Sequence, residues 1–328
     1  MDIIFVRSPF FVTIDDNPRI GSRIELKFRT KSTSYPTNPD YTISKQRVTI
    51  NSVSERYNIS DYAREYINID QPSSVVNGIE SDNLWCFVEV KRYRQTAVST
   101  FVLIDTTEYI ALNGYSQTSI DSDLVLLFNP DINKQFNAVN TTYLNILINY
   151  KGDNVNWNGL NLLRSPDPLG YYLLKVTLAL TGENTLTYFN GTEGISQSAG
   201  LSTQVCEPKY NPIIVWFINR FGGWQSLTFF KNKVETIETE SKEYHFLGGN
   251  KKAFNFQGTE SIRANTGYVD ENYNELIQDL LLSENVIVAG RKALIKSKSQ
   301  PKKTSLNDKL INFEIEFIYS DNLINDVI

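Results

Sequence analysis

The chain has 328 residues, of which 41% are hydrophobic and 21% are charged, so it can bury a proper core and is not a disordered segment. Its 32 basic and 37 acidic residues give a net charge of −5. Neither half is basic, which argues against a dedicated nucleic-acid-binding domain. One histidine and two cysteines exclude most zinc sites and most histidine-based catalytic schemes.

The N-terminus lacks the features of a secretory signal. Asp2 stands where a signal peptide needs basic residues, and the apolar run that follows is four residues long, against about 7–15 in a signal. The longest apolar run, residues 213–218, has the length of a strand and not of a membrane span. We therefore expect a chain that stays on the cytoplasmic side or leaves by a route other than secretion, with no membrane partner. Cys86 and Cys206 are then expected to be reduced.

Most of the apolar pattern has a period of two or forms short runs rich in β-branched and aromatic residues, which predicts strands. Residues 23–29 and 313–319 alternate cleanly between apolar and polar. Residues 84–90 and 98–104 are expected to flank a hairpin connection at 91–96. Further strands are predicted at 124–128, 143–150, 171–180 and 227–230.

Helical signals are few. The stronger one begins at Asp270, a possible N-cap, and an apolar stripe follows it at Tyr273, Leu276, Ile277, Leu280 and Leu281. A shorter candidate covers residues 60–67, where Ser60 could be the cap. We therefore predict a mainly β fold with two β-sandwich-like domains, each with about one packed α-helix.

Two polar segments near the middle, residues 152–161 and 165–170, are candidate linkers, because the second holds two prolines and a glycine. They predict an N-terminal β-rich domain over 1–164 and a C-terminal β-rich domain over 165–328, with its helix near 270–283. Arg-Ser-Pro occurs at 7–9 and again at 164–166, which leaves both a duplication and a coincidence open.

Candidate chemistry is sparse. His245 lies in a predicted strand without a motif that supplies a nucleophile or carboxylate partner, and no Gly-X-Ser-X-Gly, His-Glu-X-X-His or phosphate-binding glycine loop occurs. Glu314 and Glu316 share one face of a strand, as solvated acids usually do. We expect no enzymatic activity, no catalytic residue, no metal site and no cofactor.

The segment around Gly222, Gly223 and Trp224 interrupts one β-run and starts the next. Glycines there permit a tight turn or bulge, and a phosphate-cradling loop would instead lead into a helix. We predict a structural corner at these three residues.

One stretch departs from the acidic average. From residue 291 to 303 there are six basic residues and no acid, and a complementary acidic stretch precedes it at 234–243. The basic stretch could be a solvated hairpin tip, or it could contact an acidic partner or passing DNA. Pairing between copies would suit a ring. The interface residues of this hypothesis are Arg291, Lys292, Lys296, Lys298, Lys302, Lys303, Glu235, Glu238, Glu240 and Glu243.

Several segments resemble a pattern in virion structural proteins of tailed phages that infect Bacteroidetes, crAss-like phages included. They are residues 7–10, 60–62, 219–224, 265–271 and 280–286. The resemblance implies a neck, ring or tail component that assembles in the host cytoplasm, forms a cyclic oligomer of six or twelve copies around the DNA channel and contacts other neck or tail proteins. It implies no catalytic residue.

Two alternatives to this virion role remain open. One is a carbohydrate- or receptor-binding β-sandwich module of a tail tip, for which Trp157 would be the best exposed platform. The other is a β-rich hydrolase that uses two carboxylates.

Overall fold

The computed structural model describes residues 1–15, 20–47, 54–69, 71–72, 77–80, 84–115, 120, 122, 124–127, 134–137, 143–152, 154–164, 167–178, 182–190, 193–205, 211–245, 247–302, 304 and 311–321. Within these residues the chain forms 23 strands, arranged in five sheets, and two short helices. The prediction of a mainly β fold is confirmed.

The first part of the chain builds a five-stranded N-terminal sheet and a small two-stranded sheet that covers it. The N-terminal sheet has the order β1-β8-β7-β3-β4, and the small sheet pairs β2 with β5. Inward-facing residues of β3 such as Ile24, Leu26 and Phe28 share a core with Tyr57 and with Ala63 of helix α1. The strands are β1 (Asp2–Phe5), β2 (Phe11–Ile14), β3 (Gly21–Arg29), β4 (Tyr41–Gln46), β5 (Glu55–Asn58), β7 (Trp85–Ala97) and β8 (Thr100–Leu112), and the helix is α1 (Ser60–Tyr66).

Two local predictions in this part need correction. Residues 91–96 are not a connection, because β7 runs on to Ala97 and the turn lies at Val98 and Ser99, where Ser99 adopts φ 63°. Ser60 does not cap its own helix. Its Oγ instead accepts a hydrogen bond from the Phe10 amide at 2.8 Å and donates one to the Ser8 carbonyl at 2.7 Å, which ties α1 to the start of the chain.

The middle of the chain forms two sheets that enclose a core of their own, which includes Ile146 and Ile148 of β11 and the indole of Trp157. One sheet has the order β6-β14-β11-β9 and the other β10-β16-β15-β12-β13. Their strands are β6 (Gly78–Ile79), β9 (Leu124–Leu126), β10 (Lys134–Asn137), β11 (Tyr143–Tyr150), β12 (Val155–Trp157), β13 (Leu160–Leu163), β14 (Gly170–Thr177), β15 (Gly182–Asn190) and β16 (Glu193–Val205).

Both proposed linkers adjoin these sheets. Residues 152–161 contain the tight hairpin β12–β13, whose turn at Asn158 and Gly159 has positive φ at both positions, so the linker prediction is wrong there. Position 164 lies between β13 and β14, and β14 pairs along its whole length with β11. A division after residue 164 would therefore separate hydrogen-bonded neighbours. Ser165 and Pro166 lie outside the described residues.

The last part of the chain forms a seven-stranded C-terminal sheet with the order β18-β17-β21-β22-β23-β20-β19. Helix α2 (Tyr273–Leu281) packs on it through the predicted apolar stripe, with Tyr273, Leu276, Ile277 and Leu280 buried. The helix begins after Asn272, so Asp270 is not its cap. The strands are β17 (Ile213–Ile218), β18 (Trp224–Phe229), β19 (Lys233–His245), β20 (Lys251–Asn265), β21 (Val286–Val288), β22 (Arg291–Ile295) and β23 (Glu314–Tyr319).

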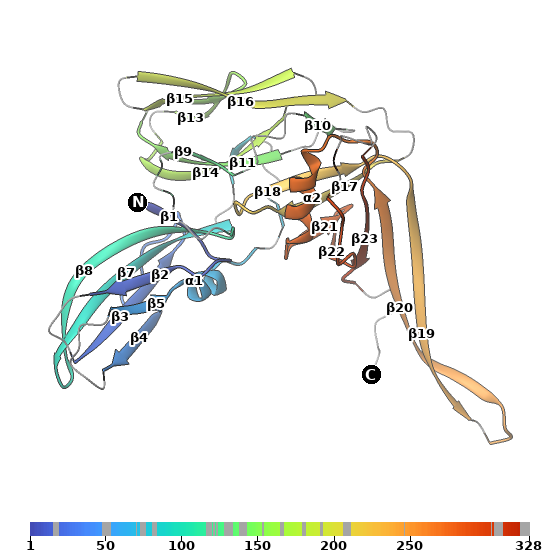
Figure 1. Cartoon of the computed structure of the whole chain (residues 1–328), viewed down its shortest axis with the longest axis horizontal. Helices are drawn as coiled ribbons and strands as arrows, with labels where there is room; N and C mark the ends of the chain where they lie inside the picture. Colours follow the sequence, from blue (N-terminus) through green and yellow to red (C-terminus); the bar gives the residue numbers. More distant parts are fainter. Residues whose placement is uncertain are drawn as a thin grey trace.

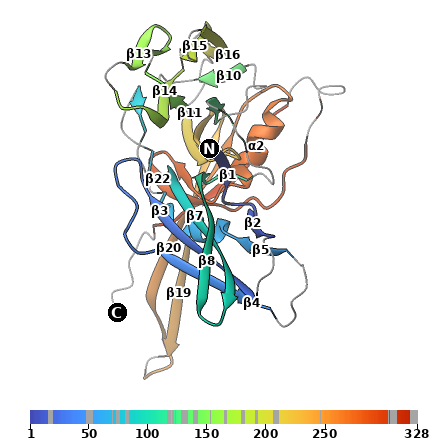
Figure 2. The same ribbon diagram turned by 90° about the vertical axis from the view of Figure 1, so that its left-hand side faces the viewer.

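Two long hairpins project from the body toward the same side of the molecule (Figures 1 and 2). One is β7–β8 from the N-terminal sheet, and the other is β19–β20 from the C-terminal sheet, which Figure 1 shows reaching well beyond its neighbours. The three parts of the chain meet at a shared core that includes Phe5, Leu112, Leu173, Trp224 and Ile287. The body is thus a packed junction from which two arms extend.

Candidate functional site

The segment of Gly222, Gly223 and Trp224 lies at the buried junction. Gly222 has φ +83°, and a Cβ there would lie 2.9 Å from the backbone nitrogens of Asn113 and Gly114. A Cβ on Gly223 would lie 2.9 Å from Leu127. The two glycines therefore let the backbones of three parts of the chain approach one another, which side chains at these positions would prevent.

Buried amides hold this junction together. The Asn219 carboxamide accepts hydrogen bonds from the amides of Phe221 and Gly223, and it donates to the Leu127 carbonyl at 2.7 Å. The Oδ1 of Asn145, on β11, accepts a hydrogen bond from the Trp224 amide at 2.7 Å. Because these buried groups are satisfied, the corner serves as a structural joint between the middle and C-terminal parts.

A buried charged pair lies next to these amides. Asn145 donates to the Glu80 carboxylate at 3.2 Å, and both residues are buried. Lys175 is 2% exposed, and its Nζ lies 4.2 Å from the ring centroid of Tyr143. Burial lowers the pKa of Lys175, and the charge of Glu80 opposes that shift. The sequence contained no signal for these two residues, since an isolated Glu and an isolated Lys look like solvated residues.

A second polar cluster joins the N-terminal part to helix α2. The buried Asp279 carboxylate accepts hydrogen bonds from Arg220 Nε at 2.8 Å and from the Tyr115 hydroxyl at 3.1 Å. Burial raises the pKa of Asp279, while Arg220 and Tyr115 favour its charged form. Asp279 could have been noticed in the sequence, because it is an acid three residues after Leu276 on the apolar side of the helix.

Three of the segments that carry the phage resemblance, 7–10, 219–224 and 280–286, contribute residues at or next to this cluster. Arg7 donates a hydrogen bond to the Leu282 carbonyl, and Arg64 Nη2 lies 2.6 Å from the Glu284 carboxylate. Ser283 Oγ accepts a hydrogen bond from the Ile218 amide at 3.1 Å. These contacts tie the start of the chain and helix α1 to the segment that follows α2, although these parts lie far apart in the sequence.

The basic stretch 291–303 is partly neutralised within its own chain. Arg291 Nη1 lies 2.7 Å from Glu260 Oε2, and its guanidinium stacks 3.9 Å from the Tyr319 ring centroid. Lys296 Nζ lies 3.1 Å from Glu316 and 3.2 Å from Glu238. Lys292 is exposed on β22, and Lys303 lies outside the described residues.

The acidic residues of the hypothesis all lie on β19, where every one of the 13 residues is exposed. Glu235 pairs with Lys233 at 2.8 Å, and Glu243 pairs with Lys251 at 3.1 Å. Glu240 has no ion-pair partner within the described part of the chain. The acidic strand and the basic stretch are thus neighbours at the base of the β19–β20 hairpin, whereas the sequence hypothesis assigned them to two different copies.

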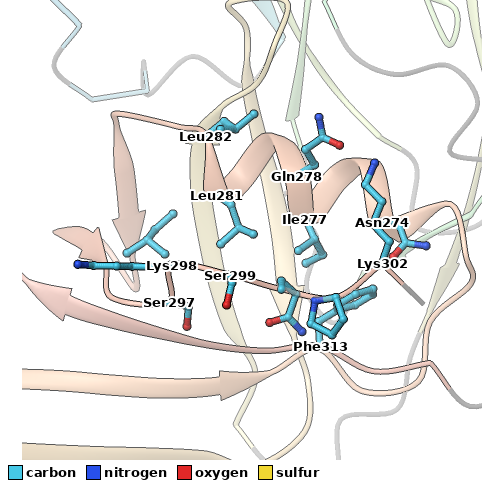
Figure 3. Close-up of a pocket in the computed structure, with 13 residues that line it drawn as sticks. Asn274, Ile277, Gln278, Leu281, Leu282, Ser297, Lys298, Ser299, Lys302 and Phe313 are labelled. Carbon is cyan, nitrogen blue, oxygen red and sulfur yellow. The ribbon is translucent and has the colours of Figure 1, made fainter.

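The remaining lysines border a groove of about 510 Å³ beside α2. Figure 3 shows Ile277 and Leu281 pointing from the helix toward the segment of Ser297, Lys298 and Ser299. Phe313 and Ile295 complete the apolar lining, and Lys298 and Lys302 stand at its edge. Neither lysine has an ion-pair partner among the residues that the structure describes.

The two arms expose large apolar side chains. On β7–β8 these are Val98, Val102, Leu103 and Ile104, and on β19–β20 they include Ile237 and Leu247. Large contiguous apolar patches are typical of surfaces for protein contacts, whereas single exposed apolar residues are ordinary.

The residues considered for sugar binding or catalysis do not form a site within the described part of the chain. Trp157 is buried and donates its indole N–H to the Thr177 carbonyl at 2.7 Å, so it offers no platform to a sugar. His245 is exposed at the end of β19. Among the described residues, no three His, Cys, Asp or Glu side chains are placed to hold a metal ion. Burial raises the pKa of Cys86, a free thiol, to about 12, and Cys206 lies outside the described residues.

Neither described helix has the length and apolar character needed to cross a bilayer. No protein-family model, no curated protein and no solved structure matches this chain.

Proposed function

We propose that this protein is a non-enzymatic virion structural protein of a tailed phage, a neck or tail ring subunit that forms a cyclic oligomer around the DNA channel. The observation that carries the proposal is the β19–β20 arm. Residues 237–260 extend past the last residue pair between β20 and β23, so among the described strands β19 and β20 pair there only with each other.

An isolated two-stranded hairpin is at best marginally stable in water. Strand β19 of this arm places no apolar face on its own body, since it is exposed along its whole length. Packing against another subunit would supply the missing layer and cover Ile237 and Leu247. The arm therefore fits a contact between subunits.

The charges indicate how such a contact would be oriented. Glu240 on the arm and Lys298 and Lys302 beside α2 have no ion-pair partners within the described residues, and they lie on different elements of the chain. A contact between two different surfaces is head-to-tail, and it closes into a ring when the rotation between copies permits. A net charge of −5 also suits a channel that lets DNA pass without binding it.

The test is native mass spectrometry together with electron microscopy of the purified chain. A closed ring of six or twelve copies is expected. A shortened variant replaces residues 240–257 with Asn-Gly, which joins the paired residues Thr239 and Gly258 by a two-residue turn. This variant should be monomeric or dimeric, and its near-ultraviolet circular dichroism should stay like that of the wild type.

Leu160→Ser is the matched control, because it removes an exposed leucine from the different hairpin β12–β13 and should leave the ring intact. A full-length chain that stays monomeric, or a shortened variant that still forms rings, would overturn the proposal. A reconstruction of the assembled particle tests the location, with density for this chain expected next to other neck or tail proteins.

A further inference from the structure

One long edge of the N-terminal sheet has no neighbour among the strands that the structure describes. Strand β8 pairs with β7 along its length, but β1 covers only Tyr109 to Leu112 on the other side. Residues 100–108 of β8 therefore present a free row of backbone donors and acceptors, with no other described strand beside them.

The side chains at the outer end of this edge are uncharged and mostly apolar. Residues 98–104 contain no charge, proline or glycine. Val98 is 85% exposed, Val102 40%, Leu103 49% and Ile104 37%. Edge strands that remain free usually carry lysines, prolines or bulges, which hinder pairing with a strand of another chain. The segment 100–103 has neither lysine nor proline, so it is a template for pairing with another strand.

Two register shifts in the β7–β8 hairpin set the length of this template. One leaves Ile104 of β8 without a partner on β7, because Arg92 faces Asp105 and Tyr93 faces Leu103. The other lies on β7, next to Ala97. Because a bulge bends its strand, the regular part of the free edge ends at Leu103. The template is therefore short and centred on Phe101 to Leu103.

We propose that residues 101–103 of β8 pair antiparallel with the same strand of a second copy, across a two-fold axis. Two identical antiparallel strands related by such an axis can place one residue opposite its own counterpart. With Val102 on the axis, Phe101 faces Leu103 of the partner subunit.

This register opposes aromatic and aliphatic side chains and no like charges, which is the favourable arrangement for cross-strand pairs. Moving the axis to Leu103 would place Phe101 opposite Asp105 of the partner subunit, which is less favourable. The free edge of the other arm, on β19, is unsuited to the same arrangement. Pairing β19 about its midpoint, Thr239, would oppose Glu238 to Glu240 and Glu235 to Glu243.

The β8 contact is isologous, so it closes on itself and does not generate a ring. It needs only a second copy of this chain, so the β8 dimer can form whether or not the proposed ring forms. Combined with a ring, it would join two rings through their β7–β8 arms.

Disulfide trapping tests the register. Val102→Cys is made with Cys206 replaced by serine, and the other cysteine, Cys86, is buried. Opposite residues in antiparallel strands have Cα atoms about 4.5–5.5 Å apart, within the range of a disulfide. Mild oxidation should convert most of the protein to a covalent dimer. Leu247→Cys, at a position that is 98% exposed on the other arm, is the control and should give little dimer.

Sedimentation equilibrium gives a second measurement. Leu103→Lys should raise the dimer dissociation constant at least tenfold with an unchanged circular dichroism spectrum, since this side chain is half exposed. Equal cross-linking of the two cysteine variants, or an unchanged dissociation constant for Leu103→Lys, would overturn the inference. Repeating the Val102→Cys cross-linking and the sedimentation of Leu103→Lys in the variant with Asn-Gly in place of 240–257 separates this contact from the ring, because the β8 dimer should persist there.

Discussion

The Nζ of Lys296 lies 3.2 Å from Oε1 of Glu238, which joins the basic stretch to the acidic strand within one chain. The same lysine also reaches Glu316 at 3.1 Å. The charges that remain available to another subunit are therefore fewer than the sequence suggests. Within the described residues, Lys298, Lys302 and Glu240 are members of the predicted interface that have no ion-pair partner.

The first prediction concerns these lysines. Replacing Lys298, Lys302 and Lys303 with glutamate should weaken assembly at low salt, and the difference from the wild type should shrink as salt screens the charges. Mass photometry at two ionic strengths measures this. Lys296→Glu is the variant for comparison. It should also destabilise the base of the β19–β20 arm within one chain, because it places a third acid beside Glu238 and Glu316. Assembly that is unchanged in the triple variant at low salt would contradict the prediction.

The second prediction concerns the glycine corner. Gly222→Ala should destabilise the fold by more than about 2 kcal/mol, because the methyl group meets backbone atoms in addition to the cost of positive φ. Gly249→Ala is closely matched, with φ +84° and no atom within 4 Å of the added methyl group. Gly249→Ala should lower the free energy of unfolding by about 1 kcal/mol. Chemical denaturation measures both, and equal losses would show that close approach at Gly222 is unimportant.

The third prediction concerns the buried amide of Asn145. Asn145→Ala leaves the Trp224 amide without its acceptor and removes one hydrogen-bond donor from Glu80, which should cost about 2–4 kcal/mol. Asn149→Ala, on the same strand but half-buried, should cost less. Urea unfolding compares the two, and a smaller loss for Asn145→Ala than for Asn149→Ala would contradict the role of the buried amide.

The fourth prediction concerns alkaline pH. Burial raises the pKa of Tyr109, so above pH 10 this tyrosine ionises in the unfolded chain while it stays protonated in the folded one. The folded state then holds more protons, and stability falls as the pH rises. In Tyr109→Phe, the free energy of unfolding should therefore fall less steeply with pH. The difference in slope from the wild type should be up to about 1.4 kcal/mol per pH unit between pH 10 and 11. Between pH 7 and 8 the wild type and the variant should show the same slope, and a difference there would exclude this cause.

Much of the local structure could be predicted from periodicity. The alternation in residues 23–29 and 313–319 appears as β3 and β23, and the stripe from Tyr273 to Leu280 packs helix α2 on its sheet. Such patterns depend on which face of one element is apolar, and neighbouring residues supply that information. The turn at Asn158 and Gly159 could have been predicted as well, since Asn-Gly between apolar residues favours a two-residue hairpin.

Contacts between distant residues could not be predicted in this way. Asn145 and Trp224, Arg220 and Asp279, and Lys296 and Glu238 come together only when separate elements dock. A polar residue in a strand looks the same in the sequence whether it faces water or a buried partner.

Composition and patterning by themselves determined a β-rich chain with few reactive side chains, because those properties are sums over single residues and their near neighbours. Tertiary structure alone decided that Trp157 is buried, that the basic and acidic stretches meet in one subunit, and that the β8 edge has no neighbour among the described strands. Each of these depends on which surfaces the packed sheets cover, and packing joins residues that lie far apart in the chain.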